Sequence, residues 1–306
     1  MAQKKEVKLR AFRISQQLPI THAQIALVDA LNTKLINSKA KTRMMQRNAN
    51  DKEYDLISYY NFDNGTFFGV NLRVITDFTS PQIDYILLES QNFSLEQLED
   101  GHAPNTVYKS HYYFCLNNTY IVTNLPGNST IIGFQTYLNW LLYTATNPYE
   151  INPLCKSTPD IKLSEIKEVI FEDDYAFSSY RRSPHDLEQT ENKIFDIAYG
   201  ALRTIFNDIT GLQEEEMKQV ISAKLLLSIK KPRNMTEDDY QRIYGALLKP
   251  IAETEHLQYV SKSGQRFSSE EIEVSSKVNI ETTEKGFLVE EQLRQSMIVF
   301  LNNLTI

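Results

Sequence analysis

Alternation of apolar and polar residues predicts strands near the beginning and near the end of this chain. Val7, Leu9 and Ala11 alternate with charged residues in the opening segment, and residues 272–281 alternate in the same way. A period of two residues is typical of a strand that buries one face and leaves the other in water. We therefore expect a strand in both segments.

A spacing of three to four residues predicts helices elsewhere. Apolar residues recur at this spacing from about 129 to 145, where Trp140, the only tryptophan, is interpreted as helping to seat the helix. The same spacing over residues 184–210 predicts a long amphipathic helix that Gly211 ends. A last helix is expected between Leu293 and Leu304.

Turn residues divide the remaining strands. The sequence Asp63-Asn64-Gly65 predicts a hairpin between residues 54–62 and 67–75, because Asn and Gly tolerate positive φ. The aromatic residues of this hairpin would stack on bases if the sheet were open, or would form a core or a domain interface. Residues 76–106 are irregular, with one short strand predicted at 85–88, and the proline-bearing residues 147–160 are expected to be a linker.

These elements predict an α+β fold with two sheet-and-helix units. The first domain is expected over residues 1–148 and the second over 161–306, where the strand and helix order is ferredoxin-like and the long helix 184–210 precedes it. Helices would cover one face of a mostly antiparallel sheet, which leaves the other face to water, a partner or a ligand. The broad apolar stripe of the long helix predicts a homo-oligomer.

Composition narrows the class of protein. The 306 residues carry a formal charge of −7, so the chain as a whole does not indicate nucleic-acid binding. The first residues lack the apolar core of a signal peptide, and no run of about 18 apolar residues indicates membrane insertion. Two cysteines are too few for a disulfide framework or a zinc site. We expect a protein of the reducing cytoplasm.

One segment departs from the acidic balance of the chain. Residues 34–47 contain five basic residues and no acid, namely Lys34, Lys39, Lys41, Arg43 and Arg47. This pattern predicts a loop that contacts phosphates, with a solvated helix end as the alternative. Further candidate nucleic-acid contacts are Arg181, Arg182, Lys230, Lys231 and Arg233.

The sequence contains no phosphate-binding loop motif, no dinucleotide-binding motif and no zinc-protease motif. One acidic cluster suggests a metal-dependent nuclease, in which carboxylates hold Mg²⁺ and a lysine assists the attacking water. Its residues would be Glu165, Lys167, Glu172, Asp173 and Asp174. A solvated acidic loop is the alternative. Outside this hypothesis, we expect no metal site and no cofactor.

Three passages resemble a known pattern. They are KLRAFRI, DLISYYNFDNGTFFGVNLRV and SHYYFCLNNTYIVTNLPGNSTIIGFQTYLNWLL, which together extend over about residues 5–145. They resemble uncharacterised bacterial families of about 300 residues that occur beside phage-defence and mobile-element genes. The resemblance implies a bacterial cytoplasmic protein of antiviral defence, and it supplies no catalytic residues.

Together these observations predict a non-catalytic subunit of an anti-phage defence system. Its ligand would be DNA, RNA or a defence-system partner protein. The metal-dependent nuclease and an oligomerising scaffold built on the helix at 184–210 are the alternatives.

Overall fold

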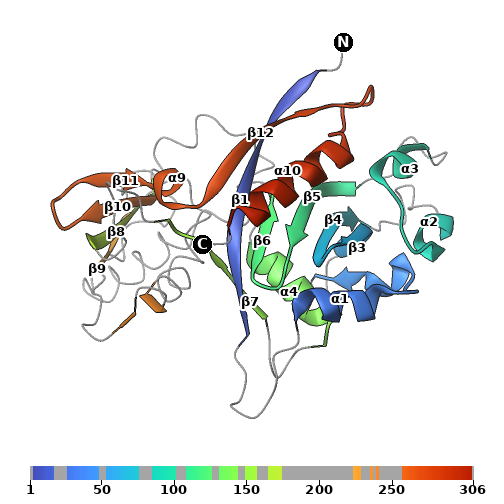
Figure 1. Cartoon of the computed structure of the whole chain (residues 1–306), viewed down its shortest axis with the longest axis horizontal. Coiled ribbons are helices and arrows are strands. Elements are labelled where there is room, and N and C mark those ends of the chain that lie inside the picture. The colour runs from blue at the N-terminus through green and yellow to red at the C-terminus, as the bar shows by residue number, and fades with distance from the viewer. Residues whose placement is uncertain are drawn as a thin grey trace, which may run out of the picture. The chain divides into compact units, whose positions relative to one another are not determined.

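The computed structural model describes residues 3–16, 26–47, 53–75, 85–100, 108–125, 131–143, 149–156, 165–173, 223–228, 235–236, 239–240 and 257–304. The chain forms two compact units (Figure 1). The first unit contains Met1–Leu154, Gly245–Glu253 and Glu273–Ile306, and the second contains Cys155–Tyr244 and Thr254–Ile272. The C-terminal residues 273–306 are therefore part of the same unit as the N-terminal residues 1–154.

The first unit is built on an eight-stranded sheet whose pairings are all antiparallel. In pairing order its strands are β12 (Ser275–Glu281), β1 (Lys4–Gln16), β6 (Tyr120–Thr123), β5 (Tyr108–Leu116), β4 (Thr66–Ile75), β3 (Glu53–Asp63) and β2 (Met45–Gln46). The strand β7 (Tyr149–Pro153) pairs with the second half of β1, whereas β12 pairs with the first half.

Helices cover both faces of this sheet. The helices α1 (Leu27–Leu35) and α4 (Ile131–Leu141) pack on one face, and α10 (Glu290–Asn302) packs on the other. The strand β4 serves both cores, because Phe67 faces α1 and α4 while Phe68 and Val70 face α10. This double coverage leaves the central strands with apolar side chains on both faces.

Two short helices and a turn of 3₁₀ helix lie in the connections of the first unit. They are η1 (Ala40–Arg43), α2 (Tyr85–Glu89) and α3 (Leu95–Asp100). The predicted β3–β4 hairpin is confirmed, and its turn residues Asn64 and Gly65 have φ values of 46° and 77°. Positive φ at both positions is the reason that this turn needs Asn and Gly.

The second unit contains a four-stranded antiparallel sheet. Its strands in pairing order are β11 (Arg266–Ser268), β10 (Leu257–Ser261), β8 (Ile166–Asp173) and β9 (Ala223–Ser228), and the short helix α9 (Ser269–Ile272) follows β11. Val169 and Tyr259, which are register partners, are both fully buried.

The predicted α+β class with a ferredoxin-like second unit is wrong. Of the described residues, 46% lie in strands and 30% in helices, and the main sheet is a curled antiparallel one. The strand β12 and the helix α10 were expected to complete a ferredoxin-like unit. Instead, β12 pairs with β1 and extends the main sheet, and α10 covers that sheet (Figure 1). The alternation of residues 272–281 does not define which strand edge they pair with. It also does not account for Glu273, which lies on the polar side of the pattern but is buried beside Arg10.

Two local predictions are also corrected. Residues 85–88, predicted as a strand, lie in the helix α2, and the predicted linker contains the strand β7. Proline is tolerated in β7 because Pro153 stands at its end. The helix predicted over 184–210 lies outside the described residues.

Candidate functional site

The basic segment predicted to contact phosphates runs from the last turn of α1 through η1 to β2. Asn37 ends α1 with a φ of 59°, and the Ser38 hydroxyl donates to the carbonyl of Leu35 over 2.8 Å. Ala40 is fully buried and begins η1. The segment is therefore a tightly turned connection that starts in the last turn of α1, where Lys34 lies.

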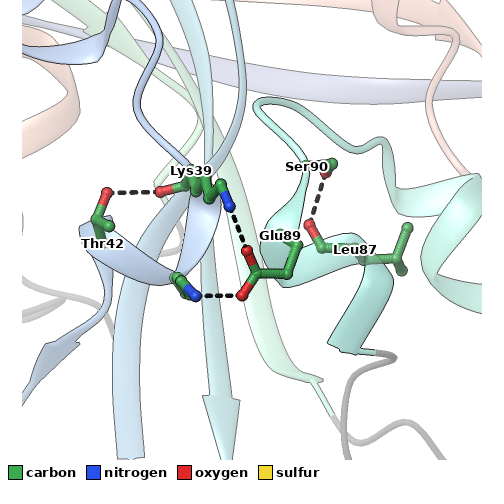
Figure 2. A network of polar contacts seen from close by, with 6 residues as sticks. Lys39, Thr42, Leu87, Glu89 and Ser90 are labelled. Carbon is green, nitrogen blue, oxygen red and sulfur yellow. Dashed lines mark hydrogen bonds and ion pairs between the residues drawn. The ribbon is translucent and has the colours of Figure 1, made fainter.

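Lys39 and Lys41 converge on one carboxylate (Figure 2). Lys39 Nζ lies 2.6 Å from Oε2 of Glu89, and Lys41 Nζ contacts Oε1 of the same residue. Both lysine side chains remain about half exposed, with exposed fractions of 54% and 42%. Their charges are thus partly compensated but still face solvent.

Arg43 is buried, with only 1% of its surface exposed. Its Nη2 donates to the carbonyl of Gln91, and the guanidinium carbon lies 5.2 Å from the centre of the Tyr60 ring. Burial lowers the pKa of this guanidinium. Among the described residues, Arg43 Nε and Nη1 have no hydrogen-bond partner. A side chain this deeply placed does not reach a ligand on the surface.

Arg47 belongs to an ion-pair cluster around Asp55. Its Nε lies 3.4 Å from Asp55, and Arg73 Nε lies 2.9 Å from the other carboxylate oxygen. Glu53 adds a longer contact to Arg47 at 3.7 Å. The Asp55 side chain is almost fully buried, so the two arginines neutralise a charge that would otherwise be costly. Arg47 is therefore engaged in this cluster with Asp55 and Glu53.

An exposed aromatic pair lies at the end of α4. Tyr143 is 77% exposed and adopts a φ of 54°, which is uncommon for a residue other than glycine. Trp140 is 38% exposed, and its ring packs against that of the buried Tyr137 with ring centres 6.0 Å apart. Lys34 Nζ lies 4.1 Å from the centre of the Tyr143 ring. We call Lys34, Trp140 and Tyr143 the aromatic platform.

The aromatic platform was missed by the sequence reasoning, although a signal was present. The inward face of α4 contains Phe134, Leu138 and Leu141. Trp140 falls out of phase with that stripe and shares a face with the exposed Ile132, whereas Tyr143 lies beyond the last residue of α4. The signal in the sequence was the pair of large aromatic residues Trp140 and Tyr143, which fall outside the apolar stripe of α4.

The aromatic residues of the β3–β4 hairpin are not available for stacking on bases. Phe67 and Phe68 are buried in opposite cores, and Tyr60 packs against Phe67 with ring centres 6.0 Å apart. The Tyr60 hydroxyl donates to the carbonyl of Leu35. The rings of Tyr60, Phe67 and Phe68 therefore belong to the cores of the first unit, which agrees with the interpretation of the hairpin aromatics as core residues.

Four of the five residues proposed for a nuclease lie on or beside β8 in the second unit, namely Glu165, Lys167, Glu172 and Asp173. The Glu165 side chain is exposed, and Lys167 Nζ lies 2.7 Å from Glu168, a neighbour outside the predicted set. The backbones of Glu172 and Asp173 pair with Lys224 and Ala223 of β9. No group of three or more metal-binding side chains is found among the residues that the structure describes.

A cysteine–histidine nucleophile is not formed on β5. Cys115 is fully buried, and burial raises the pKa of its thiol to about 12. The thiolate, which is the nucleophilic form, is therefore scarce near neutral pH. Burial also lowers the pKa of His111 on the same strand.

The remaining predicted site residues lie outside the described residues. They are Asp174, Arg181, Arg182, Lys230, Lys231 and Arg233. Within the described ranges, no helix is both long and apolar enough to cross a bilayer.

Comparison with protein-family models, with curated proteins and with solved structures found no match. The site is therefore interpreted from its own chemistry.

Proposed function

We propose that this chain is a non-catalytic protein that binds single-stranded nucleic acid through the aromatic platform. The observation that carries the proposal is the placement of the Lys34 ammonium 4.1 Å above the exposed ring of Tyr143. An exposed ring with a cation beside it offers one surface for a base and one charge for a phosphate. Each nucleotide of a single strand carries one base and one phosphate that could make these two contacts.

The arrangement of charge supports an anionic ligand. Lys34, Lys39 and Lys41 lie within eight consecutive residues, and Glu89 is the carboxylate that contacts two of them. This local excess of positive charge occurs in a chain of net charge −7. A ligand attracted here is therefore recognised locally, because the chain as a whole repels polyanions.

The aromatic residues favour a single strand over a duplex. Stacking on an exposed aromatic side chain contributes about 1–3 kcal/mol per base, and it requires that the base be unstacked from its neighbours. Tyr143 and Trp140 offer such contacts without reading a particular sequence. We therefore expect binding with little base preference and a marked dependence on salt.

The resemblance of residues 5–145 to families found beside phage-defence genes supports a biological setting. In this proposal the protein acts in the bacterial cytoplasm, as a homo-oligomer that joins a defence-system partner. Among the described residues, no arrangement favours the nuclease or the scaffold alternative over this one.

Trp140 supplies the test, because it is the only tryptophan in the chain. A short oligothymidylate titrated at low salt should quench its fluorescence, and an oligonucleotide of the same length that lacks bases should bind more weakly. Tyr143→Ala should weaken binding about tenfold, at the lower end of the loss expected for one stacked base.

Val299→Ala is the control, since Val299 is an exposed residue of α10, which packs on the opposite face of the sheet from α4. It should leave the affinity unchanged. The proposal is wrong if oligothymidylate does not bind at about 50 mM salt, where phosphate contacts are strong. Equal affinities for wild type and Tyr143→Ala would also reject it.

A further inference from the structure

Glu89 bridges two lysines in the way that a bound anion would. Its Oε2 accepts from Lys39 and its Oε1 accepts from Lys41, so each oxygen of the carboxylate has its own ammonium donor (Figure 2). A phosphate group also presents separate oxygens to separate donors. Each ammonium has three N–H groups, so a contact with Glu89 does not exhaust either lysine.

The contact with Glu89 is not required to hold η1 against the segment that follows α2. The Ala40 N–H donates to the carbonyl of Ser90 over 2.9 Å, and Arg43 donates to the carbonyl of Gln91. The Phe93 N–H donates to the carbonyl of Ser58, also over 2.9 Å. One main-chain hydrogen bond and the bond from the Arg43 side chain therefore keep η1 beside this segment if the Glu89 charge is removed, and the Phe93 N–H ties the segment to β3.

The position of Glu89 does not stabilise its own helix either. It is the last residue of α2, and a negative charge at a helix C-terminus is unfavourable because the carbonyls there carry partial negative charge. Lys39 and Lys41 supply ion pairs that stabilise the Glu89 carboxylate. Ion pairs of half-exposed lysines contribute about 0–1 kcal/mol each, so a polyanion can displace this carboxylate.

We infer that Lys39 and Lys41 form a phosphate-binding site and that Glu89 occupies it as an internal competitor. This inference rests on the proposed function and adds its regulation. In this inference a phosphate of the bound strand lies between the two lysines, and Glu89 turns toward solvent. The affinity of the wild-type protein for the strand is therefore limited, because the phosphate must first displace the carboxylate of Glu89.

Glu89→Gln tests the inference, since it keeps the size of the side chain and removes its charge. We expect oligothymidylate to bind about tenfold more tightly to this variant, with a steeper decline of affinity as salt increases. Glu96→Gln is the control, because Glu96 is an exposed carboxylate on the neighbouring α3. It removes the same charge and should change the affinity less than twofold, within the effect expected of a solvated charge.

A second probe separates this inference from the proposed function. Tripolyphosphate has no bases, so we expect its binding to depend on Lys39 and Lys41 and not on the rings of the aromatic platform. Calorimetry should detect binding of tripolyphosphate to the Glu89→Gln variant. In the double variant Lys39→Ala, Glu89→Gln, this binding should be lost.

Three outcomes are informative. If oligothymidylate fails to bind but tripolyphosphate binds Glu89→Gln, the phosphate site is supported and the proposed function is rejected. If oligothymidylate binds the wild type and Glu89→Gln equally, the proposed function stands and the competitor is rejected. If tripolyphosphate binds Glu89→Gln and the double variant equally, the phosphate site is rejected.

Discussion

Val278 lies directly opposite Val7 in the antiparallel pairing of β12 with β1, although nearly the whole chain separates the two residues. Both side chains contribute to the core that α10 covers. The first strand of the protein therefore gains one of its neighbours only after the C-terminal segment has been made. Such a non-local pairing costs loop-closure entropy, and the contacts of α10 help to offset it.

The first prediction concerns the helix that covers this pairing. Leu293 and Met297 of α10 are fully buried against the sheet. Leu293→Ala should lower the free energy of unfolding by about 2–5 kcal/mol, because it leaves a cavity in the core. Val299→Ala on the exposed face of the same helix should change it by less than about 0.5 kcal/mol. Urea denaturation followed by circular dichroism measures both; equal losses would show that α10 does not pack here.

The second prediction concerns the buried hydroxyl of Tyr137. It accepts a hydrogen bond from the N–H of Ile57 and donates one to the carbonyl of Arg43, each over 2.9 Å. Tyr137→Phe leaves both backbone groups without this partner and should cost about 1–3 kcal/mol in unfolding experiments. Tyr143→Phe removes a hydroxyl from an exposed ring and should be nearly neutral. A neutral Tyr137→Phe would contradict the role of this hydroxyl in joining α4 to the basic segment.

The third prediction concerns the ion-pair cluster around Asp55. Asp55→Asn leaves Arg47 and Arg73 beside a neutral amide in a largely buried place. Loss of one partner from such a cluster should lower the free energy of unfolding by about 3 kcal/mol. Glu6→Gln provides the comparison, since Glu6 pairs with Lys277 over 3.0 Å where both side chains are more than half exposed. That change should cost less than about 1 kcal/mol, and thermal or urea unfolding of the two variants distinguishes them.

The fourth prediction concerns the pH dependence of stability. Burial raises the pKa of Glu290, the nearby Glu96 raises it further, and a hydrogen bond from Tyr113 opposes both effects. A carboxyl whose pKa is higher in the folded state binds its proton more tightly there. The stability from this proton is complete below the unfolded pKa of about 4.3 and is lost as pH rises through the folded pKa.

Glu290→Gln removes this titration. The variant should gain stability relative to the wild type as pH rises from about 4 to 7. Urea denaturation at a series of pH values measures the difference between the two proteins. A difference that stays constant with pH, or that shrinks as pH rises, would contradict the raised pKa.

Much of the secondary structure could be predicted from the sequence, because its signals are local. The hairpin at Asn64-Gly65 follows from the positive φ of the two turn residues, and the apolar stripe of α4 follows from its spacing. The strand at residues 85–88 was predicted wrongly, since a short apolar run fits a strand and a short helix equally well. Tertiary packing selected the helix.

The candidate site was less predictable than the elements that carry it. The basic residues of segment 34–47 look equivalent in the sequence, yet Arg43 is buried beside Tyr60 while Lys39 and Lys41 face solvent around Glu89. Their partners come from α2, some fifty positions away in the chain. A charge count along the sequence does not contain this information.

The sequence by itself determined most of the pattern of strands and helices, because alternation in strands and spacing in helices depend only on backbone geometry. It also determined the tight turn at Asn64-Gly65. Only the tertiary structure decided that β12 pairs with β1 and that Glu89 meets Lys39 and Lys41. The physical reason is that strand edges and ion pairs are chosen by global packing, in which any edge of suitable register or any charge within reach can be the partner.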